Sequence, residues 1–132
     1  MWSTKNRLPM IAPAIERELY RYIRAKGAQT RCRVLEVGGT ADHLHVLVSI
    51  PPVVSLAGFV KTVKGASSHH INEVFSGHHL LYWQVGYDAR SISADAVGQV
   101  RRYIQSQKVH HASGDVDARL ETADRARPDQ AR

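Results

Sequence analysis

Two short motifs carry residue types that could do chemistry together. His43-Leu44-His45 has strand spacing, in which residues i and i+2 point to the same face. Tyr103 and Gln107 have helix spacing, in which residues i and i+4 share a face. If the two faces meet, the site holds two imidazoles, an amide oxygen and a phenol. This set predicts a metal site beside a tyrosine nucleophile, and therefore metal-assisted cleavage of a phosphodiester.

The expected ligands favour a hard divalent cation. Tetrahedral zinc generally takes more nitrogen or sulfur than two imidazoles and one amide provide. An incomplete shell with open positions suits Mg²⁺ or Mn²⁺, which also bind phosphate oxygens and water. Such an ion polarises a scissile phosphate and neutralises charge in the transition state. Asp42 directly precedes the histidines and could orient one imidazole.

Tyr103 needs electrostatic help to act as a nucleophile, because a phenol has a pKa of about 10. A nearby cation supplies that help. Arg101 and Arg102 stand directly before Tyr103 and could hold backbone phosphates.

The elements that would position these residues alternate between helix and strand. Pro13 begins a predicted helix that ends near Gly27, Ser55 caps a long second helix, and Ser93 caps a third that fades near residues 110–111. Strands are predicted over residues 32–37, 43–50 and 80–87, after a short strand at the N-terminus. This order favours an α+β fold with helices packed on a mainly antiparallel sheet.

Length and charge set the class of protein. The chain has 132 residues and a net charge of +6, and its first forty residues carry eight Lys or Arg against three Asp or Glu. A basic domain of this size suits a nucleic-acid partner, although a soluble protein of high pI remains an alternative. We expect one folded domain over residues 1–112 and a mobile tail over residues 113–132, where apolar residues are sparse.

Cysteine usage and hydropathy predict the cellular setting. Cys32 is the only cysteine, so an internal disulfide is impossible and a cytoplasmic location is expected. No apolar run is long enough to span a membrane, and the N-terminus has no signal-peptide pattern. We expect no small-molecule cofactor.

Four motifs in order resemble the small single-tyrosine HUH transposases of bacterial insertion sequences, the IS200-like family. They are residues 42–52 (DHLHVLVSIPP), 60–68 (VKTVKGASS), 82–87 (YWQVGY) and 101–111 (RRYIQSQKVHH), preceded by residues 2–9 (WSTKNRLP). The resemblance implies a ferredoxin-like or RRM-like HUH domain with a central antiparallel sheet. It also implies that the chain begins inside its first strand, so we expect that strand to be short or missing.

The resemblance further implies a mechanism and partners. His43, His45 and Gln107 would bind the metal, and Tyr103 would attack single-stranded DNA to leave a 5′-phosphotyrosine and a free 3′-OH. A second 3′-OH would then reverse the linkage and rejoin the DNA. The expected partners are single-stranded DNA with hairpin ends and a second copy of the chain, whose tyrosine helix completes the site in several relatives. The side chains expected near DNA are Lys61, Lys64, Ser67, Ser68, Arg101 and Arg102.

Two other functions remain open. The same fold could bind single-stranded nucleic acid without catalysis, as a catalytically silent or domesticated module. A small zinc hydrolase could use some of the eight histidines. The combination of His43, His45, Tyr103 and Gln107 favours the enzyme, since a binding module needs none of these residues.

Overall fold

The computed structural model describes residues 1–75 and 80–107. Three strands, three α-helices and two short 3-10 turns follow one another in this part of the chain. In order they are β1 (Trp2–Ser3), η1 (Lys5–Arg7), α1 (Pro13–Gln29), β2 (Arg33–Gly39), β3 (His43–Ser49), α2 (Leu56–Val74), η2 (Ala94–Ala96) and α3 (Val97–Gln105).

The sheet is antiparallel, with β3 between β1 and β2. β1 is only two residues long, as expected, and pairs with His43 and Leu44 of β3. Residues 80–88 run beside the other edge of β1, where Gln84 donates its backbone N–H to Ser3 O and Lys5 donates to Tyr82 O. The spatial order, segment 80–88, β1, β3, β2, is that of a ferredoxin-like sheet. The predicted α+β class is confirmed.

The predicted strand at residues 80–87 is wrong as a regular strand. Only one bridge forms, between Thr4 and Trp83. Leu81 instead exchanges both of its backbone hydrogen bonds with the side chain of Asn72, at 2.6 and 3.0 Å. Gly86 then has a positive φ of 94°, which turns the chain out of the ladder. With only two residues of β1 to pair against, the segment stays extended without becoming a ladder.

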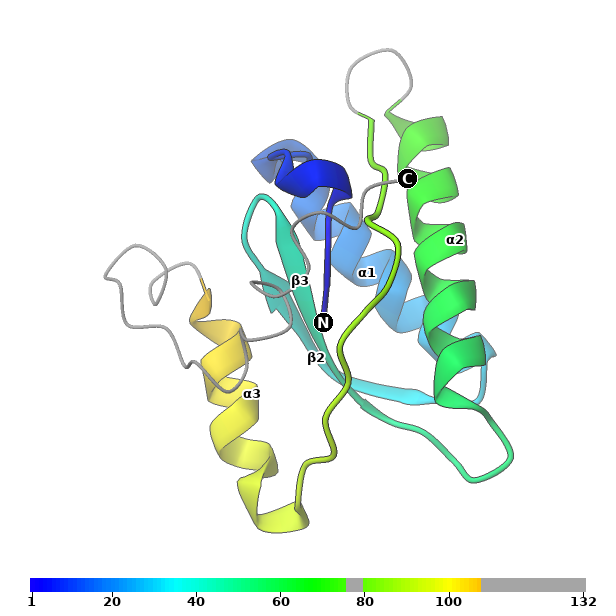
Figure 1. Cartoon of the computed structure of the whole chain (residues 1–132), viewed down its shortest axis with the longest axis vertical. Helices are drawn as coiled ribbons and strands as arrows, with labels where there is room; N and C mark the ends of the chain where they lie inside the picture. Colours follow the sequence, from blue (N-terminus) through cyan, green and yellow to red (C-terminus); the bar gives the residue numbers. More distant parts are fainter. Residues whose placement is uncertain (76–79, 108–132) are drawn as a thin grey trace.

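The helices cover both faces of the sheet (Figure 1). α1 and α2 pack together on one face, while α3 lies on the other and contacts β2 and β3. The first face holds the main core, in which side chains of both helices meet the sheet: Ile15, Leu19, Ile23, Phe59, Val60, Val63, Ile71, Val37 and Leu44. Pro13 begins α1, and the Ser55 hydroxyl accepts from Gly58 N at 3.0 Å to cap α2. Both predicted helix starts are confirmed.

The third helix differs from the prediction at both ends. Ser93 makes no side-chain capping bond, and a 3-10 turn precedes the α-helix, which begins at Val97. α3 ends at Gln105 with Ser106 as its cap, so Gln107 lies just past the helix. The expected fading near residues 110–111 and the tail over 113–132 lie outside the described residues.

Candidate active site

β3 places the two histidines on the face that α3 covers. The alternation of the strand sends Leu44 into the main core and puts His43 and His45 on the opposite side. Both imidazoles are buried, with exposed fractions of 0% and 5%, and their rings meet edge to face at 5.3 Å between centroids. The predicted pairing of two imidazoles on one face is confirmed.

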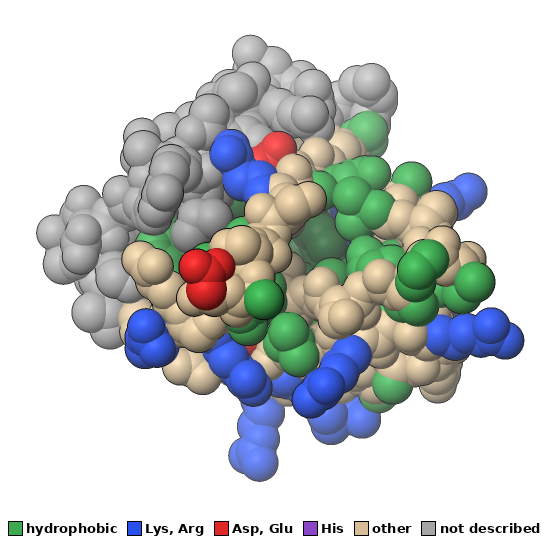
Figure 2. Space-filling view, turned by 90° about the horizontal axis from the view of Figure 1, so that it is seen from below, with side chains coloured by type: hydrophobic (Ala, Val, Ile, Leu, Met, Phe, Trp, Pro, Cys, Tyr) green, Lys and Arg blue, Asp and Glu red, His purple; other side chains and the backbone are tan. Residues whose placement is uncertain are grey.

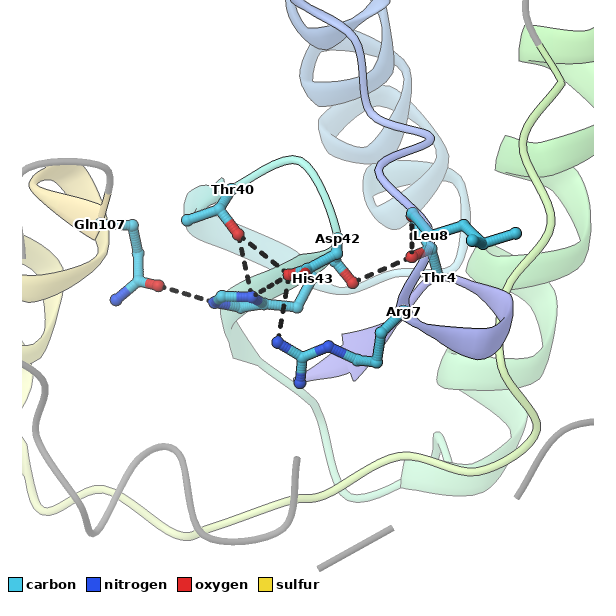
Figure 3. Close-up of polar contacts among 7 residues, drawn as sticks. All are labelled: Thr4, Arg7, Leu8, Thr40, Asp42, His43 and Gln107. Carbon is cyan, nitrogen blue, oxygen red and sulfur yellow. Dashed lines mark hydrogen bonds and ion pairs between the residues drawn. The ribbon is translucent and has the colours of Figure 1, made fainter. Parts of the chain in front are cut away.

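A hydrogen-bond network orients His43 (Figure 3). Its Nδ1 lies 2.9 Å from Asp42 Oδ1 and 3.0 Å from Thr40 Oγ1. Burial by itself raises the pKa of Asp42, but the hydrogen bond from His43 and the charge of Arg7 outweigh it and lower this pKa from 3.8 to about 2. An ionised carboxylate can only accept, so Nδ1 carries the proton of the neutral ring and Nε2 presents a lone pair.

The N-terminal segment supports this network. Arg7 donates to Asp42 Oδ1 at 3.1 Å, and the Thr4 hydroxyl lies within hydrogen-bond distance of Leu8 O and Asp42 O, at 2.6 and 3.1 Å. Thr4 is fully buried. The sequence indicated the role of Asp42, because it directly precedes the histidines. It gave no signal for Arg7 or Thr4, which reach the site only through the pairing of β1 with β3.

Gln107 reaches His43 across 64 residues of sequence. Its Oε1 lies 2.9 Å from His43 Nε2, and its side chain is 1% exposed. In the neutral ring Nε2 is an acceptor like Oε1, so a proton or a cation must lie between these two atoms. Gln107 Nε2 is buried without a partner among the described residues. Turning the amide over would satisfy the imidazole but leave the oxygen buried and unpaired. A cation beside the two atoms would satisfy both lone pairs.

These residues fit a hard divalent cation. Neighbouring ligands at about 2.1 Å from an octahedral ion are about 3 Å apart, close to the 2.9 Å between Oε1 and Nε2. Asp42 and Thr40 hold the far nitrogen of His43, as second-layer partners of metal-bound histidines do. Across residues 1–75 and 80–107, no three His, Cys, Asp or Glu side chains gather as a metal site. A zinc hydrolase built on such ligands stays a prediction, since four of the eight histidines lie outside the described residues.

Tyr103 stands next to the second histidine. Its half-buried ring meets His45 edge to face, with centroids 5.9 Å apart and planes at 83°. The contacts are made within one chain, since α3 packs on its own sheet. The fold therefore brings together all four residues that the two motifs singled out: His43, His45, Tyr103 and Gln107.

A groove of about 760 Å³ opens beside His45. His45 lines it, together with apolar side chains of β3 and α3 that include Leu47, Val100 and Ile104. Figure 2, which views the molecule of Figure 1 from below, shows a hollow among hydrophobic side chains, with Lys and Arg side chains spread around the border of the molecule. The groove leaves room for an extended ligand next to His45.

The residues expected near DNA lie on two different elements. Lys61 is exposed on α2, but Lys64 donates to Gln84 O and Gly86 O at 2.7 and 2.8 Å. Ser67 is fully buried and accepts from Trp83 Nε1 at 3.1 Å. Because α2 lies on the face opposite the histidines, these side chains do not join the site.

The remaining expected contacts are at or near the surface. Ser68, next along α2, is half-buried and donates to Gly65 O at 3.2 Å. On α3, Arg102 is exposed, whereas Arg101 lies 3.5 Å from Glu36. Contact of any of these side chains with DNA stays a prediction. Among the described residues, no helix combines the length and apolar character needed to cross a membrane.

Comparison with known proteins places this site in a family. The profile of IS200-like transposases matches residues 1–107. The ISDra2 transposase TnpA of Deinococcus radiodurans is 28% identical over 114 residues, which cover 81% of this chain and 80% of that protein. The transposase for insertion sequence element IS200 of Salmonella typhimurium is 34% identical over 83 residues, which cover 63% of this chain and 55% of that protein.

A solved structure has the same fold. The crystal structure of a candidate transposase from Deinococcus radiodurans R1 superposes with a TM-score of 0.63 over 80% of this chain and 85% of that one, at 24% identity. Together, the fold and the profile define the class: the chain belongs to the family of IS200-like transposases. Transposition of DNA is the function that this membership supports, and the predicted family is confirmed.

Proposed function

We propose that the chain cuts and rejoins single-stranded DNA through Tyr103, with a divalent Mg²⁺ or Mn²⁺ held by His43, His45 and Gln107. One observation carries the proposal: a phenol and an amide oxygen from the C-terminal part meet two imidazoles of β3 on one buried face. A module that only binds nucleic acid needs no such convergence.

The chain's own residues account for the bond changes. The phenol of Tyr103 loses its proton to solvent, and its oxygen forms a bond to the scissile phosphorus. The bond from phosphorus to the 3′ oxygen breaks, and that oxygen takes up a proton to become a 3′-OH. Attack by another 3′-OH reverses the step and releases Tyr103. No external energy source is needed, because each phosphodiester bond broken is replaced by another phosphodiester bond.

The surrounding residues orient the reacting groups. Asp42 and Thr40 fix the ring of His43 so that Nε2 faces the site. A cation bound there would neutralise charge on the scissile phosphate and polarise it. The apolar groove beside His45 would exclude water from the bases of an extended strand and provide surface for them.

The proposed partners are single-stranded DNA with hairpin ends and a second copy of this chain. The extended segment that follows α2 exposes three large apolar side chains, Leu80, Tyr82 and Val85, at 56%, 49% and 45%. Exposed apolar side chains of this size suit burial against another subunit. Light scattering of the purified protein should give the mass of a dimer, and hairpin DNA should compete better than the same bases without the hairpin.

The deciding experiment is a covalent-capture assay. The protein is mixed with single-stranded oligonucleotides that carry the flanking ends of its own gene, with Mg²⁺ or Mn²⁺, and separated under denaturing conditions. We expect a metal-dependent adduct that Tyr103→Phe abolishes while DNA binding is kept. Tyr22→Phe is the matched control, because Tyr22 lies on α1, on the face of the sheet opposite the histidines, where its ring stacks on His70. An adduct that persists in Tyr103→Phe would assign the nucleophile elsewhere, and binding with no adduct in the unaltered protein would point to a silent binding module.

A further inference from the structure

The helix that carries Tyr103 has a second flank with its own partners. Arg101 and Gln105 are four residues apart and share one side of α3. Tyr103, two residues from each, lies on the other side and contacts His45. One side of α3 therefore contacts β3 through Tyr103, and the side that carries Arg101 and Gln105 faces β2.

Glu36 of β2 receives this second flank. Its Oε2 accepts from Gln105 Nε2 at 2.8 Å and lies 3.5 Å from Arg101 Nε. Its Oε1 accepts from Arg24 at 2.8 Å and from the Val37 amide at 3.2 Å. Arg24 belongs to α1 on the opposite face of the sheet. One carboxylate at the outer strand thus connects a helix from each face.

A β-bulge in β2 sets the direction of the Glu36 side chain. The pairing of β2 with β3 shifts between Val34 and Glu36, which makes Leu35 an extra residue. Such a bulge redirects the side chain that follows it. Glu36 is only 8% exposed. Burial raises its pKa, but the Gln105 hydrogen bond, the Val37 amide and the two arginines outweigh this and lower the pKa below 4.5, so the group is charged.

α3 depends on contacts of this kind because it is short. A nine-residue helix has little stability of its own and depends on packing. It approaches the sheet closely at Gly38, where an added Cβ would overlap the Ile104 carbonyl oxygen and lie 2.8 Å from Ile104 Cγ2. A helix seated along one central line can roll about its axis. A hydrogen bond on one side of the helix restricts this rotation and thereby fixes the position of Tyr103 on the other side.

We propose that Glu36 is a positioning residue for the tyrosine reaction: by holding Arg101 and Gln105 it fixes the rotation of α3, and with it the placement of Tyr103 against His45. This inference rests on the proposed function for its catalytic consequence. Its structural consequence, the orientation of α3, is independent of that function. No direct contact of Glu36 with DNA is involved.

The test compares Glu36→Gln with the unaltered protein and with Glu73→Gln. Glu73 is an exposed carboxylate of α2, with a side chain 72% exposed and a partner, His69, on its own helix. Glu36→Gln keeps the size of the side chain, and its two arginine partners are 44% and 48% exposed, so no buried charge is abandoned. If this variant does not fold, Gln105→Ala removes the bond from the exposed side of α3.

The first readout does not need catalysis. Protein labelled with 3-fluorotyrosine gives one fluorine signal for Tyr103, assigned through Tyr103→Phe, and hydrogen exchange follows the amides of α3. We expect Glu36→Gln to shift that signal and to speed exchange in α3, with α2 and β3 unchanged and Glu73→Gln without effect. An unshifted signal together with unchanged exchange overturns the proposal.

The second readout separates rate from affinity. A misplacement of about 1 Å costs on the order of 100-fold in rate. We expect the single-turnover rate of adduct formation to fall about 10- to 100-fold in Glu36→Gln. DNA affinity should be unchanged or tighter, since Arg101 is released. Equal rates in Glu36→Gln and Glu73→Gln overturn the positioning role. If the unaltered protein forms no adduct, the proposed function fails, and the fluorine signal still decides whether Glu36 orients α3.

Discussion

The close approach of α3 to the sheet at Gly38 can be tested with one added methyl group. Gly38 pairs with His45 across the β2–β3 ladder, so a change here acts directly under the site. In Gly38→Ala, the new Cβ would overlap the Ile104 carbonyl oxygen and lie 2.8 Å from Ile104 Cγ2, whereas ordinary contact begins at 3.4 Å. Gly38 does not have a positive φ, since Gly86 is the one glycine in the described part of the chain that does. The backbone at position 38 therefore accepts alanine without strain.

The expected loss of rate follows from the displacement of α3. A side chain can rotate away from 2.8 Å, but a helix carbonyl cannot, so α3 itself has to lift from the sheet. We take the displacement as about 1 Å, which predicts a loss of about 100-fold in the rate of adduct formation. Overpacking of this kind costs about 1–3 kcal/mol of stability, so the protein should stay folded.

Gly65→Ala is the matched control, because nothing lies within 4 Å of a Cβ at that exposed position of α2. Alanine inside a helix is favoured over glycine by about 0.5–1 kcal/mol, so this variant should be slightly more stable and fully active. Thermal unfolding, hydrogen exchange of α3 and the covalent-capture assay are measured on both. An unaltered rate in Gly38→Ala, with normal exchange in α3, would refute the reasoning that Tyr103 is placed by this contact.

Three further predictions follow from the described contacts. Asp42→Asn should weaken Mn²⁺ binding, measured by calorimetric titration, by about 10- to 100-fold because the ring of His43 loses its charged partner; unchanged affinity would exclude His43 as an oriented ligand. Burial lowers the pKa of Lys64 from 10.5 to about 8, so between pH 8 and 10.5 the unfolded state binds more protons than the folded state. The free energy of unfolding of the unaltered protein, minus that of Lys64→Met, should therefore rise with pH over this range. A difference that does not change with pH would contradict this. DNA affinity should fall steeply with salt, and Arg102→Ala or Lys61→Ala should each reduce the log–log slope by about 1 if these exposed side chains bind phosphate; a slope equal to that of the unaltered protein would remove that residue from the DNA path.

Several features could be predicted from the sequence because they depend on neighbours along the chain. The alternation of a strand is enough to put His43 and His45 on one face, whatever the strand packs against. Pro13 and Ser55 act within the first turn of their own helices, so the starts of α1 and α2 were predictable. The order of the elements likewise indicated the α+β class.

Other predictions failed where distant parts of the chain decide the outcome. Residues 80–87 have the composition of a strand, but Asn72 takes both backbone bonds of Leu81 and leaves the segment without a ladder. Ser67 has the polarity of a surface residue and is nevertheless buried against Trp83. No local pattern reveals either contact, because each partner comes from another element.

The sequence by itself determined which groups could do chemistry: two imidazoles at strand spacing, and a phenol and an amide four residues apart near the C-terminal end. Only the tertiary structure decided that the amide oxygen of Gln107 lies 2.9 Å from His43 Nε2 and that a buried carboxylate, Glu36, accepts a hydrogen bond from Gln105 of α3. The reason is physical. Spacing sets the directions of side chains within one element, whereas the packing of elements on a common sheet sets the distances between them.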